Sequence, residues 1–480
     1  MGDPGLGCRR TDVAVIGAGI SGLALAYYLA GKGLNVRVIE RGERVGGAIR
    51  TTRANGFLIE HGPSALLESS PLLHRLFTDL RIESSRLFAS SEARFRYIVR
   101  GGALHPLPTS LPGLVSSKLF SARAKARLLG EPFARPAPKD AEETLAAFVE
   151  RRLGREFLDY GVNPFVAGVY AGVPEELSAR SAFPWLYSLE QKHGSILKGA
   201  MLAAFQRRRR GAASMRRARL FSFREGLQTL IDALEKRLGD AIHTGANLKS
   251  VQPMDGGYLL DLHSGNAAMQ LHTRSLAFTI PAHAYAHLEF PFDFPIGSAL
   301  EQVHYPPVAV VFCGYKNHPG GRPLDGFGFL VPQCEQRQIL GTIWNSTLFP
   351  GRAPEGGAAL TTFVGGVRQP ENATLPDGPL IDMVRKELEF LLGIQASPDE
   401  VQVVRWSRAI PQYRPGYQQF KNSLDAFEAR HPRLYFGGNF RGGISVPNCI
   451  EHSRALGDRI AGDLGKPPCP ATGSHSGNPS

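Results

Sequence analysis

Three glycines and one glutamate near the start of the chain have the types and spacing of a dinucleotide site. Gly17, Gly19 and Gly22 directly follow the β-branched run of residues 13–16 and open an apolar helical pattern. Glycine permits the tight turn, the close approach of backbone to a pyrophosphate, and close packing of helix on strand. Glu40 ends a second strand pattern, where a carboxylate accepts hydrogen bonds from ribose hydroxyls. The predicted cofactor contacts here are Gly17, Ala18, Gly19, Ile20, Ser21, Gly22 and Glu40.

A second glycine-rich turn follows at once, in the run Glu40-Arg-Gly-Glu-Arg-Val-Gly-Gly-Ala48. It resembles the Arg-x-Gly-Gly element of the large flavoprotein family that holds amine oxidases, carotene desaturases and protoporphyrinogen oxidases. The resemblance implies that the dinucleotide is FAD and that a later Gly-Pro segment lies beside the isoalloxazine ring. A surface charge at Arg44 and a ligand-free turn at 61–65 are the alternatives. The residues implied are Arg41, Arg44, Gly46, Gly47, Ala48, Gly62, Pro63, Ser64 and Ala65.

A basic β-hairpin is predicted at 93–108, where alternating residues enter and leave the turn at Gly101. Its sequence resembles the protoporphyrinogen oxidases, which implies that Arg94 pairs with a propionate of a tetrapyrrole. A guanidinium can hold a carboxylate bidentately and so fix the orientation of the ring. Arg94, Arg96 and Arg100 could equally be the polar face of a strand.

Short helical patterns fill residues 111–219, and the motif at 168–172 also resembles that family. There the helical domain docks peripherally on membranes and lines the substrate entrance, although these glycines could instead cap helices. The arginine-rich run 206–219 is interpreted as a solvated loop in preference to a lipid-headgroup contact. Nucleic acid is disfavoured, because no aromatic side chains interleave with the arginines.

The segments 327–332 and 410–413 match the same family, in which apolar residues grip the macrocycle. Plain core is the alternative for such residues. A strand, glycine turn and helix at 433–456 would direct a positive helix end at the flavin N1–C2 carbonyl. Many relatives carry Asn-Asp where this chain has Val446-Pro-Asn448, and Cys449 is interpreted as an inert thiol. The resemblance implies substrate contacts at Arg94, Gly168, Leu330, Phe363 and Ile410, and cofactor contacts at Leu248, Asn439, Ile444, Ser445 and Val446.

Composition sets broader limits. The chain has 480 residues, 43% hydrophobic and 20% charged, which is enough for two or three domains. Five scattered cysteines without a Cys-x-x-Cys pair predict a reducing compartment, no disulfide framework and no metal site. The net charge of +12 predicts a basic surface. No signal peptide or spanning helix is expected, so the predicted location is cytoplasmic, with peripheral contact to membranes at most.

The fold expected is a Rossmann-type FAD-binding domain, a mixed α+β substrate domain and an inserted helical, membrane-docking domain. This expected fold is similar to that of amine oxidases and p-hydroxybenzoate hydroxylase. The expected boundaries are 10–90, 220–284 and 430–465 for the FAD-binding domain, 91–110 and 285–429 for the substrate domain, 111–219 for the helical domain, and 466–480 for a disordered tail.

The resemblance implies an oxygen-dependent FAD oxidase that converts protoporphyrinogen IX to protoporphyrin IX in haem biosynthesis and releases hydrogen peroxide. Hydride would pass from a meso carbon to flavin N5. We name no catalytic general base, and His61 and the arginines are weak candidates for proton handling. The alternatives are coproporphyrinogen III oxidation, a flavin amine oxidase, a carotenoid desaturase, or a protein that binds flavin or tetrapyrrole without turnover. Hand-over to a ferrochelatase and a homodimer are further expectations.

Overall fold

The first sheet is built from three segments that are far apart in the chain. The computed structural model describes residues 9–138, 142–209, 219–265, 267–290, 294 and 296–465, so the predicted tail and most of the run 206–219 lie outside it. The strand order is β10-β2-β1-β13-β12-β11, and β19 pairs with β13. The strands are β1 (Arg9–Ile16), β2 (Val36–Ile39), β10 (Ile242–His243), β11 (Asn247–Met254), β12 (Gly257–Ser264), β13 (Ala267–Phe278) and β19 (Leu434–Phe436).

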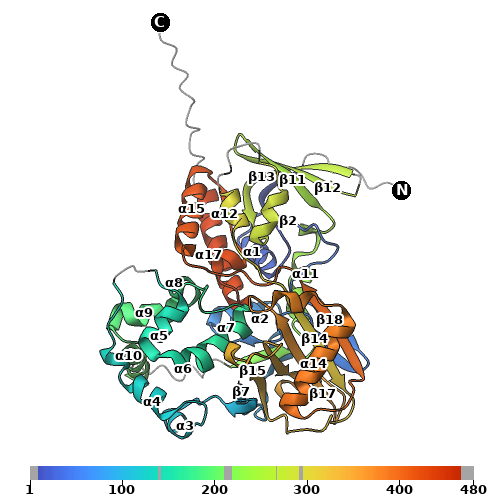
Figure 1. Ribbon diagram of the computed structural model, residues 1–480. Coiled ribbons are helices and arrows are strands. Elements are labelled where there is room, and N and C mark those ends of the chain that lie inside the picture. Colours follow the sequence, from blue (N-terminus) through green and yellow to red (C-terminus); the bar gives the residue numbers. More distant parts are fainter. Residues whose placement is uncertain are drawn as a thin grey trace.

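The β-branched run that ends β1 is fully buried, because parallel strands flank it on both sides. Helix α1 follows the glycine turn and packs against α17 and α11 (Figure 1). The helices of this lobe are α1 (Ile20–Ala30), α2 (Pro71–Asp79), α11 (Gln228–Leu238), α12 (Gly297–Glu301), α15 (Tyr417–Arg430), α16 (Asn439–Gly442) and α17 (Val446–Leu464). Two small sheets join the lobes, with strands β3 (Thr51–Ala54), β4 (Phe57–Glu60), β5 (Leu66–Leu67), β6 (Arg86–Phe88) and β9 (Leu220–Phe223).

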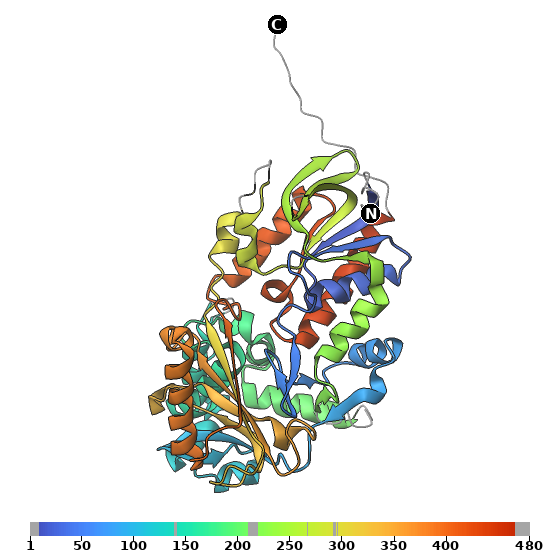
Figure 2. The ribbon, with the colours of Figure 1, turned by 90° about the vertical axis from the view of Figure 1, so that its right-hand side faces the viewer.

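The second sheet has the strand order β18-β14-β17-β16-β15-β7-β8 and lies in the lower lobe (Figure 2). Alternate residues of each strand point to opposite faces. Ala309 and Val311 belong to the core beneath helix α14, whereas Val308, Val310 and Phe363 lie on the opposite side, called here the far face. The elements are β7 (Phe95–Arg100), β8 (Ala103–Pro106), β14 (Val308–Tyr315), β15 (Gly326–Leu330), β16 (Gly341–Trp344), β17 (Ala358–Gly365), β18 (Glu400–Trp406), α13 (Asn345–Leu348) and α14 (Asp377–Leu392).

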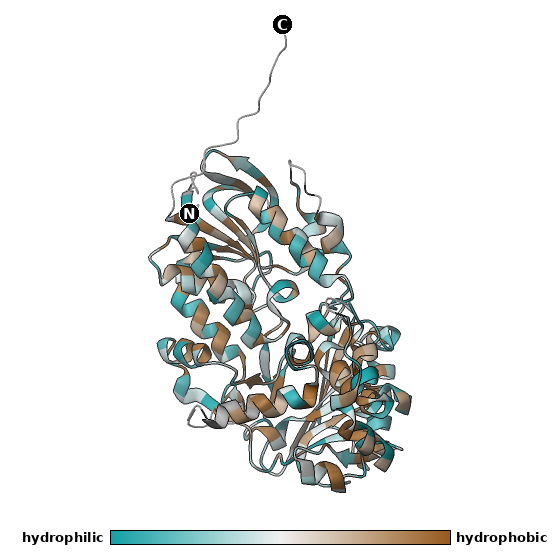
Figure 3. Cartoon of the chain, turned by 90° about the vertical axis from the view of Figure 1, so that its left-hand side faces the viewer, coloured by the Kyte–Doolittle hydropathy of each residue, from teal (hydrophilic) through white to brown (hydrophobic). Residues whose placement is uncertain are grey.

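A helical part lies beside the second sheet and is inserted between β8 and β9. A π-helical turn at Leu158–Val162 leads directly into α7. This turn changes the direction of α7 within an otherwise continuous helical run. Figure 3 faces this side and shows hydrophobic and hydrophilic residues mixed on its helices. The helices are α3 (Leu111–Ser116), α4 (Ala122–Leu129), α5 (Leu145–Leu153), α6 (Arg155–Phe157), α7 (Asn163–Tyr170), α8 (Ala179–Ala182), α9 (Pro184–His193) and α10 (Ile196–Arg209).

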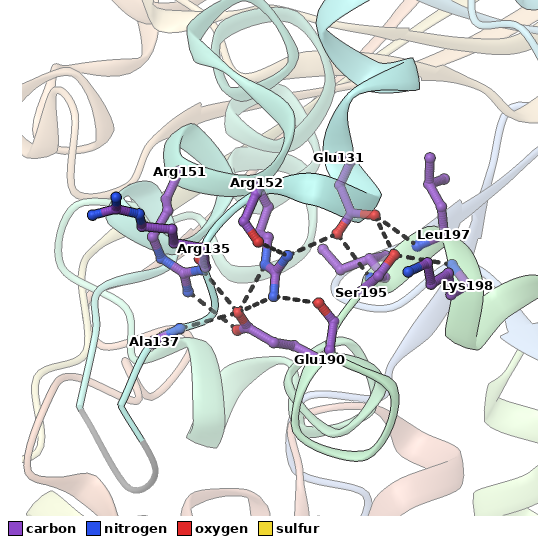
Figure 4. A network of polar contacts seen from close by, with 12 residues as sticks. Glu131, Arg135, Ala137, Arg151, Arg152, Glu190, Ser195, Leu197 and Lys198 are labelled. Carbon is purple, nitrogen blue, oxygen red and sulfur yellow. Dashed lines mark hydrogen bonds and ion pairs between the residues drawn. The ribbon is translucent and has the colours of Figure 1, made fainter.

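A buried ionic network ties these helices together (Figure 4). Arg152 on α5 has no solvent exposure, and its Nε donates to Glu190 Oε1 at 2.7 Å. Its Nη1 lies 3.4 Å from Glu131 Oε1. Glu131 in turn accepts the backbone N–H of Ile196 at 2.9 Å and the hydroxyl of Ser195, at the start of α10. One guanidinium therefore links α5, α9 and α10 through two carboxylates.

No helix in the described parts of the chain is both long and apolar enough to cross a membrane.

Candidate cofactor and substrate site

The first glycine turn has no room for side chains at two of its three glycines. Gly17 adopts φ +102°, a conformation that residues with a side chain rarely adopt. A Cβ added at Gly22 would lie 1.8 Å from the carbonyl oxygen of Gly17. At Gly19 an added Cβ would meet nothing within 4 Å, so this position borders open space beside the turn. The turn thus packs tightly inward and presents Gly19 outward.

The second glycine turn lies directly against the first. The Gly46 N–H donates to the carbonyl of Ala18 at 2.8 Å, and Gly19 and Gly46 form a parallel bridge. A Cβ on Gly47 would lie 3.3 Å from the Cα of Gly19. The two turns therefore form one continuous surface of bare backbone beside the N-terminus of α1, which fits a pyrophosphate.

Arg44 is tied to this turn. Its Nη1 donates to the carbonyls of Val45 at 3.0 Å and Ile49 at 3.3 Å, and its Nη2 donates to Gly47 at 2.6 Å. Partial burial and the neighbouring Arg50 lower its pKa. The guanidinium holds the loop in shape, which is a different role from the free surface charge considered as an alternative. Arg41, Arg44, Gly47 and Ala48 are exposed, whereas Gly46 is buried.

Glu40 joins the end of β2 to both neighbouring loops. Its Oε2 accepts the N–H of Ala18 and its Oε1 accepts that of Gly42, both at 2.8 Å. A carboxylate has about four acceptor positions, so capacity for ribose hydroxyls remains. The Ala246 N–H donates to the Glu40 carbonyl at 2.9 Å, which brings the start of β11 to the same edge. The Leu248 side chain is buried in the core, and a contact with adenine stays a prediction.

The C-terminal helix α17 begins beside the same region. Ser445 caps it by accepting the Asn448 N–H at 3.2 Å, and the Ser453 hydroxyl donates to the Ser21 carbonyl of α1 at 2.8 Å. Its N-terminus projects beyond the start of α1 and can stabilise negative charge on a ligand. Burial raises the pKa of the Cys449 thiol, as the inert interpretation requires. Asn439, Ile444 and Val446 are half-buried, and Ser445 is exposed.

The segment 61–65 is packed between the second glycine turn and the second sheet. A Cβ on Gly62 would lie 2.4 Å from the carbonyl oxygen of Ala48, and the His61 N–H donates to Arg50 at 2.9 Å. On the other side, the Trp406 indole N–H donates to the His61 carbonyl at 2.9 Å. Gly62, Pro63, Ser64 and Ala65 are half-buried. Burial, with Arg50 and Arg44, lowers the pKa of His61, so its imidazole is neutral.

Glu60 is a buried carboxyl next to this segment. Burial raises its pKa from 4.5 to about 7, although Thr51 and the Leu227 N–H both donate to it. The folded protein therefore binds more protons than the unfolded chain between these pH values. The contribution of Glu60 to the free energy of unfolding is complete below pH 4.5. It is lost, by on the order of 3 kcal/mol, as the pH rises through 7.

We expect Glu60→Gln to abolish this decline, because the amide keeps the shape and does not ionise. Denaturant unfolding at pH 5.5 and pH 8 measures the difference. Glu225→Gln, at an exposed carboxylate, is the control and should retain the wild-type decline. A decline of unchanged size in Glu60→Gln would show that another group causes it.

The four apolar substrate candidates come together on the far face. An added Cβ on Gly168 of α7 would lie 2.5 Å from Leu330 Cδ2, so helix and strand touch there. Gly341 of β16 pairs with both Leu330 and Phe363. Phe363 and Ile410 are half-buried and pack against a cluster that includes Ala167 of α7 and Ala171, which directly follows α7. Leu330, Phe363 and Ile410 thus leave part of each side chain uncovered beside α7.

The three hairpin arginines have different surroundings. Arg100 forms an ion pair with Glu156 at 2.6 Å and lies over the ring of Tyr160. Arg94 and Arg96 are exposed, and neither has an acidic partner within 4.0 Å among the described residues. Arg94 lies just before β7, whereas Arg96 pairs with Gly328, two positions from the pair of Ile98 and Leu330. Arg96 is therefore the arginine closer along the strand to Leu330.

Three residues of the site were not predicted. Phe165 and Val169 of α7 are 46% and 39% exposed, and they share a helix face with Gly168. Their helical spacing was visible in the sequence. Nothing in the sequence indicated a role for Trp406, because its contact with His61 joins residues 345 positions apart.

Comparisons with known proteins agree with this geometry. The family described as flavin containing amine oxidoreductase matches residues 20–460. Protoporphyrinogen oxidase 2, chloroplastic/mitochondrial, from Arabidopsis thaliana is 33% identical, over 93% of each chain. Coproporphyrinogen III oxidase from Bacillus subtilis is 30% identical, over 93% of this chain and 97% of the relative. A solved structure of a candidate protoporphyrinogen oxidase from Exiguobacterium has a TM-score of 0.79 at 24% identity, covering 96% of this chain and all of that one.

These matches confirm the predicted fold class, an amine-oxidase-like flavoprotein. The paired glycine turns, Glu40 and the α17 N-terminus fit FAD, and the matched family is named for its flavin. The cofactor is therefore FAD, as predicted. With 441 of its residues matched, from 20 to 460, this chain belongs to the flavin containing amine oxidoreductase family.

Proposed function

We propose that the protein oxidises protoporphyrinogen IX to protoporphyrin IX, with oxygen as the acceptor, in haem biosynthesis. The observation that supports this best is the far face: an apolar wall beside two arginines that have no carboxylate partner in the part of the chain that the structure describes. It matches a broad, largely apolar macrocycle that carries carboxylates at one edge. The curated relatives named above act on such porphyrinogens by their names.

In this proposal FAD supplies the hydride acceptor, and the chain supplies binding and orientation. Leu330, Phe363 and Ile410 hold one face of the ring through apolar contact. Arg94 and Arg96 bind the propionates and set the rotation of the ring in its plane. His61 lies on the cofactor side and stays a weak candidate for handling a proton, because burial and the neighbouring arginines lower its pKa.

Coproporphyrinogen III is the second candidate substrate, and the Bacillus relative supports it. It has four propionates, where protoporphyrinogen IX has two. Glu156 already neutralises Arg100, which leaves two available arginines in the hairpin. Two free cations match two propionates, and this favours protoporphyrinogen IX. An amine oxidase or a carotenoid desaturase gives no use to this arginine pair. A carrier without turnover could bind propionates in the same way, and anaerobic bleaching of the flavin by the porphyrinogen would exclude it.

The test is to add each porphyrinogen separately in air and follow porphyrin fluorescence. We expect Arg94→Ala and Arg96→Ala each to raise KM about 10- to 100-fold, because a charged hydrogen bond is worth about 1.5–3 kcal/mol. Arg75→Ala, at an exposed position on α2, is the matched control and should leave KM unchanged. If the yellow protein oxidises neither substrate, the proposal fails.

We also propose the predicted division into three domains, which the two sheets and the inserted helices support, with one change. Helix α12 and all but the last residue of α15 fall within the predicted substrate domain of 285–429, but both helices pack in the lobe of the first sheet (Figure 1). Peripheral membrane contact through the helical part is proposed as well. Large apolar side chains are exposed there at Val115, Leu129, Phe133, Trp185, Met201, Leu202 and Phe205. Hand-over of product to a ferrochelatase and a homodimer extend the proposal.

A further inference from the structure

Trp406 touches both halves of the proposed site. It pairs with Val308 at the end of β18, on the far face, and packs in the same apolar cluster as Phe363 and Ile410. Its indole N–H reaches across and donates to the His61 carbonyl at 2.9 Å. His61 begins the segment 61–65, which lies on the glycine turns. One side chain therefore contacts the substrate candidates and the cofactor side together.

A second residue of the same strand makes a parallel contact. Gln402 lies four positions before Trp406, on the same face, and its Nε2 lies 3.3 Å from His61 Nε2. The Thr52 hydroxyl donates to Gln402 Oε1 at 3.3 Å and lies 3.0 Å from the same ring nitrogen. β18 thus holds both the main chain and the ring of His61.

The tethered segment has no regular structure of its own. Residues 61–65 form neither helix nor strand, whereas β18 is paired along its length with β14. Irregular backbone keeps its position only where neighbours hold it, and a strand that is hydrogen-bonded along its whole length is a rigid support, even at the edge of a sheet. A directional hydrogen bond from such a strand is suited to fix the segment within a fraction of an ångström.

We propose that Trp406 is a positioning residue, which sets the separation between the cofactor-side segment 61–65 and the apolar wall that holds the substrate. This inference rests on the proposed function for its substrate. A displacement of about 1 Å between reacting groups can lower a rate about 100-fold. Trp406 acts through His61 and its neighbours, so it should influence turnover and the environment of the flavin more than substrate affinity.

The test compares Trp406→Phe with Trp344→Phe in the FAD-loaded protein. Phenylalanine keeps an aromatic ring and removes the indole N–H. Trp344 lies in the core beneath the opposite face of the same sheet, and its Nε1 has no partner within the described structure. Trp344→Phe therefore removes an equal volume without breaking a hydrogen bond, and controls for packing.

We expect Trp406→Phe to change the shape of the visible flavin spectrum and to lower kcat about tenfold, with KM altered less than about threefold. Trp344→Phe should lower the melting temperature and leave the spectrum and kcat unchanged. A wild-type spectrum and kcat in Trp406→Phe would overturn the inference. If that variant does not fold, Gln402→Met decides by the same two readouts. Because the spectrum needs no porphyrinogen, it tests Trp406 even if neither porphyrinogen is a substrate.

Discussion

Replacing Arg152 by methionine is expected to lower the free energy of unfolding by about 3–5 kcal/mol. The side chain is fully buried, and its loss leaves the buried carboxylate of Glu131 without its cation, whereas Glu190 keeps the ion pair with Arg151. An unpaired buried charge is far more costly than a lost surface contact. The substitution also removes the hydrogen bonds that the guanidinium donates to the carbonyls of Ala134 and Gly194, at 3.0 and 2.8 Å. Chemical denaturation followed by circular dichroism measures the effect.

Arg155→Met is the matched control, because Arg155 follows on the next helix and its ion pair with Asp159 is exposed. We expect its effect to stay within about 0.5 kcal/mol. The triple change Glu131→Gln, Arg152→Met, Glu190→Gln should recover much of the loss, since neutral groups replace the whole buried set. Equal stabilities of Arg152→Met and Arg155→Met would contradict the role assigned to the network.

Alanine at Gly22 is expected to yield a protein that holds no flavin and unfolds at a lower temperature. The new Cβ would lie 1.8 Å from the Gly17 carbonyl, so helix α1 must move away from β1. Overpacking of this kind typically costs about 1–3 kcal/mol, and it distorts the turn that faces the pyrophosphate. Flavin absorbance per protein and the melting temperature of the FAD-free protein are the measurements.

Alanine at Gly19 separates cofactor binding from folding. Its backbone has φ −70°, which alanine adopts freely, and an added Cβ meets nothing within 4 Å. We expect the FAD-free protein to keep its wild-type melting temperature, while FAD affinity falls at least about 100-fold, because the methyl group enters the space of the pyrophosphate. Normal FAD affinity in this variant would place the cofactor elsewhere.

Much of the cofactor half could be predicted because its signals are local. The strand, glycine turn and helix at residues 13–30 follow one another in the chain, and the φ of Gly17 and the space at Gly22 concern close neighbours. The mostly apolar runs 308–312 and 360–364, which lie in β14 and β17, likewise indicate buried strands. For this family, sequence pattern was sufficient to identify the fold and FAD.

Contacts between residues that lie far apart in the chain could not be predicted from the sequence. Arg94, Arg96 and Arg100 look alike in the printed chain, and only the fold brings Glu156 to Arg100 and leaves the other two without a carboxylate partner among residues 9–138, 142–209, 219–265, 267–290, 294 and 296–465. Arg44 likewise could be a surface charge until its three carbonyl partners are seen.

The sequence by itself determined the nucleotide-binding turns, the fold class and the family, because these depend on residue type at short spacing. The tertiary structure alone decided which arginines remain available, that Trp406 reaches His61, and that Arg152 lies between two glutamates. The physical reason is that charge pairing and hydrogen bonding depend on distance in space. Folding sets that distance by packing apolar faces, and the pattern of apolar residues does not show which polar groups this packing brings together.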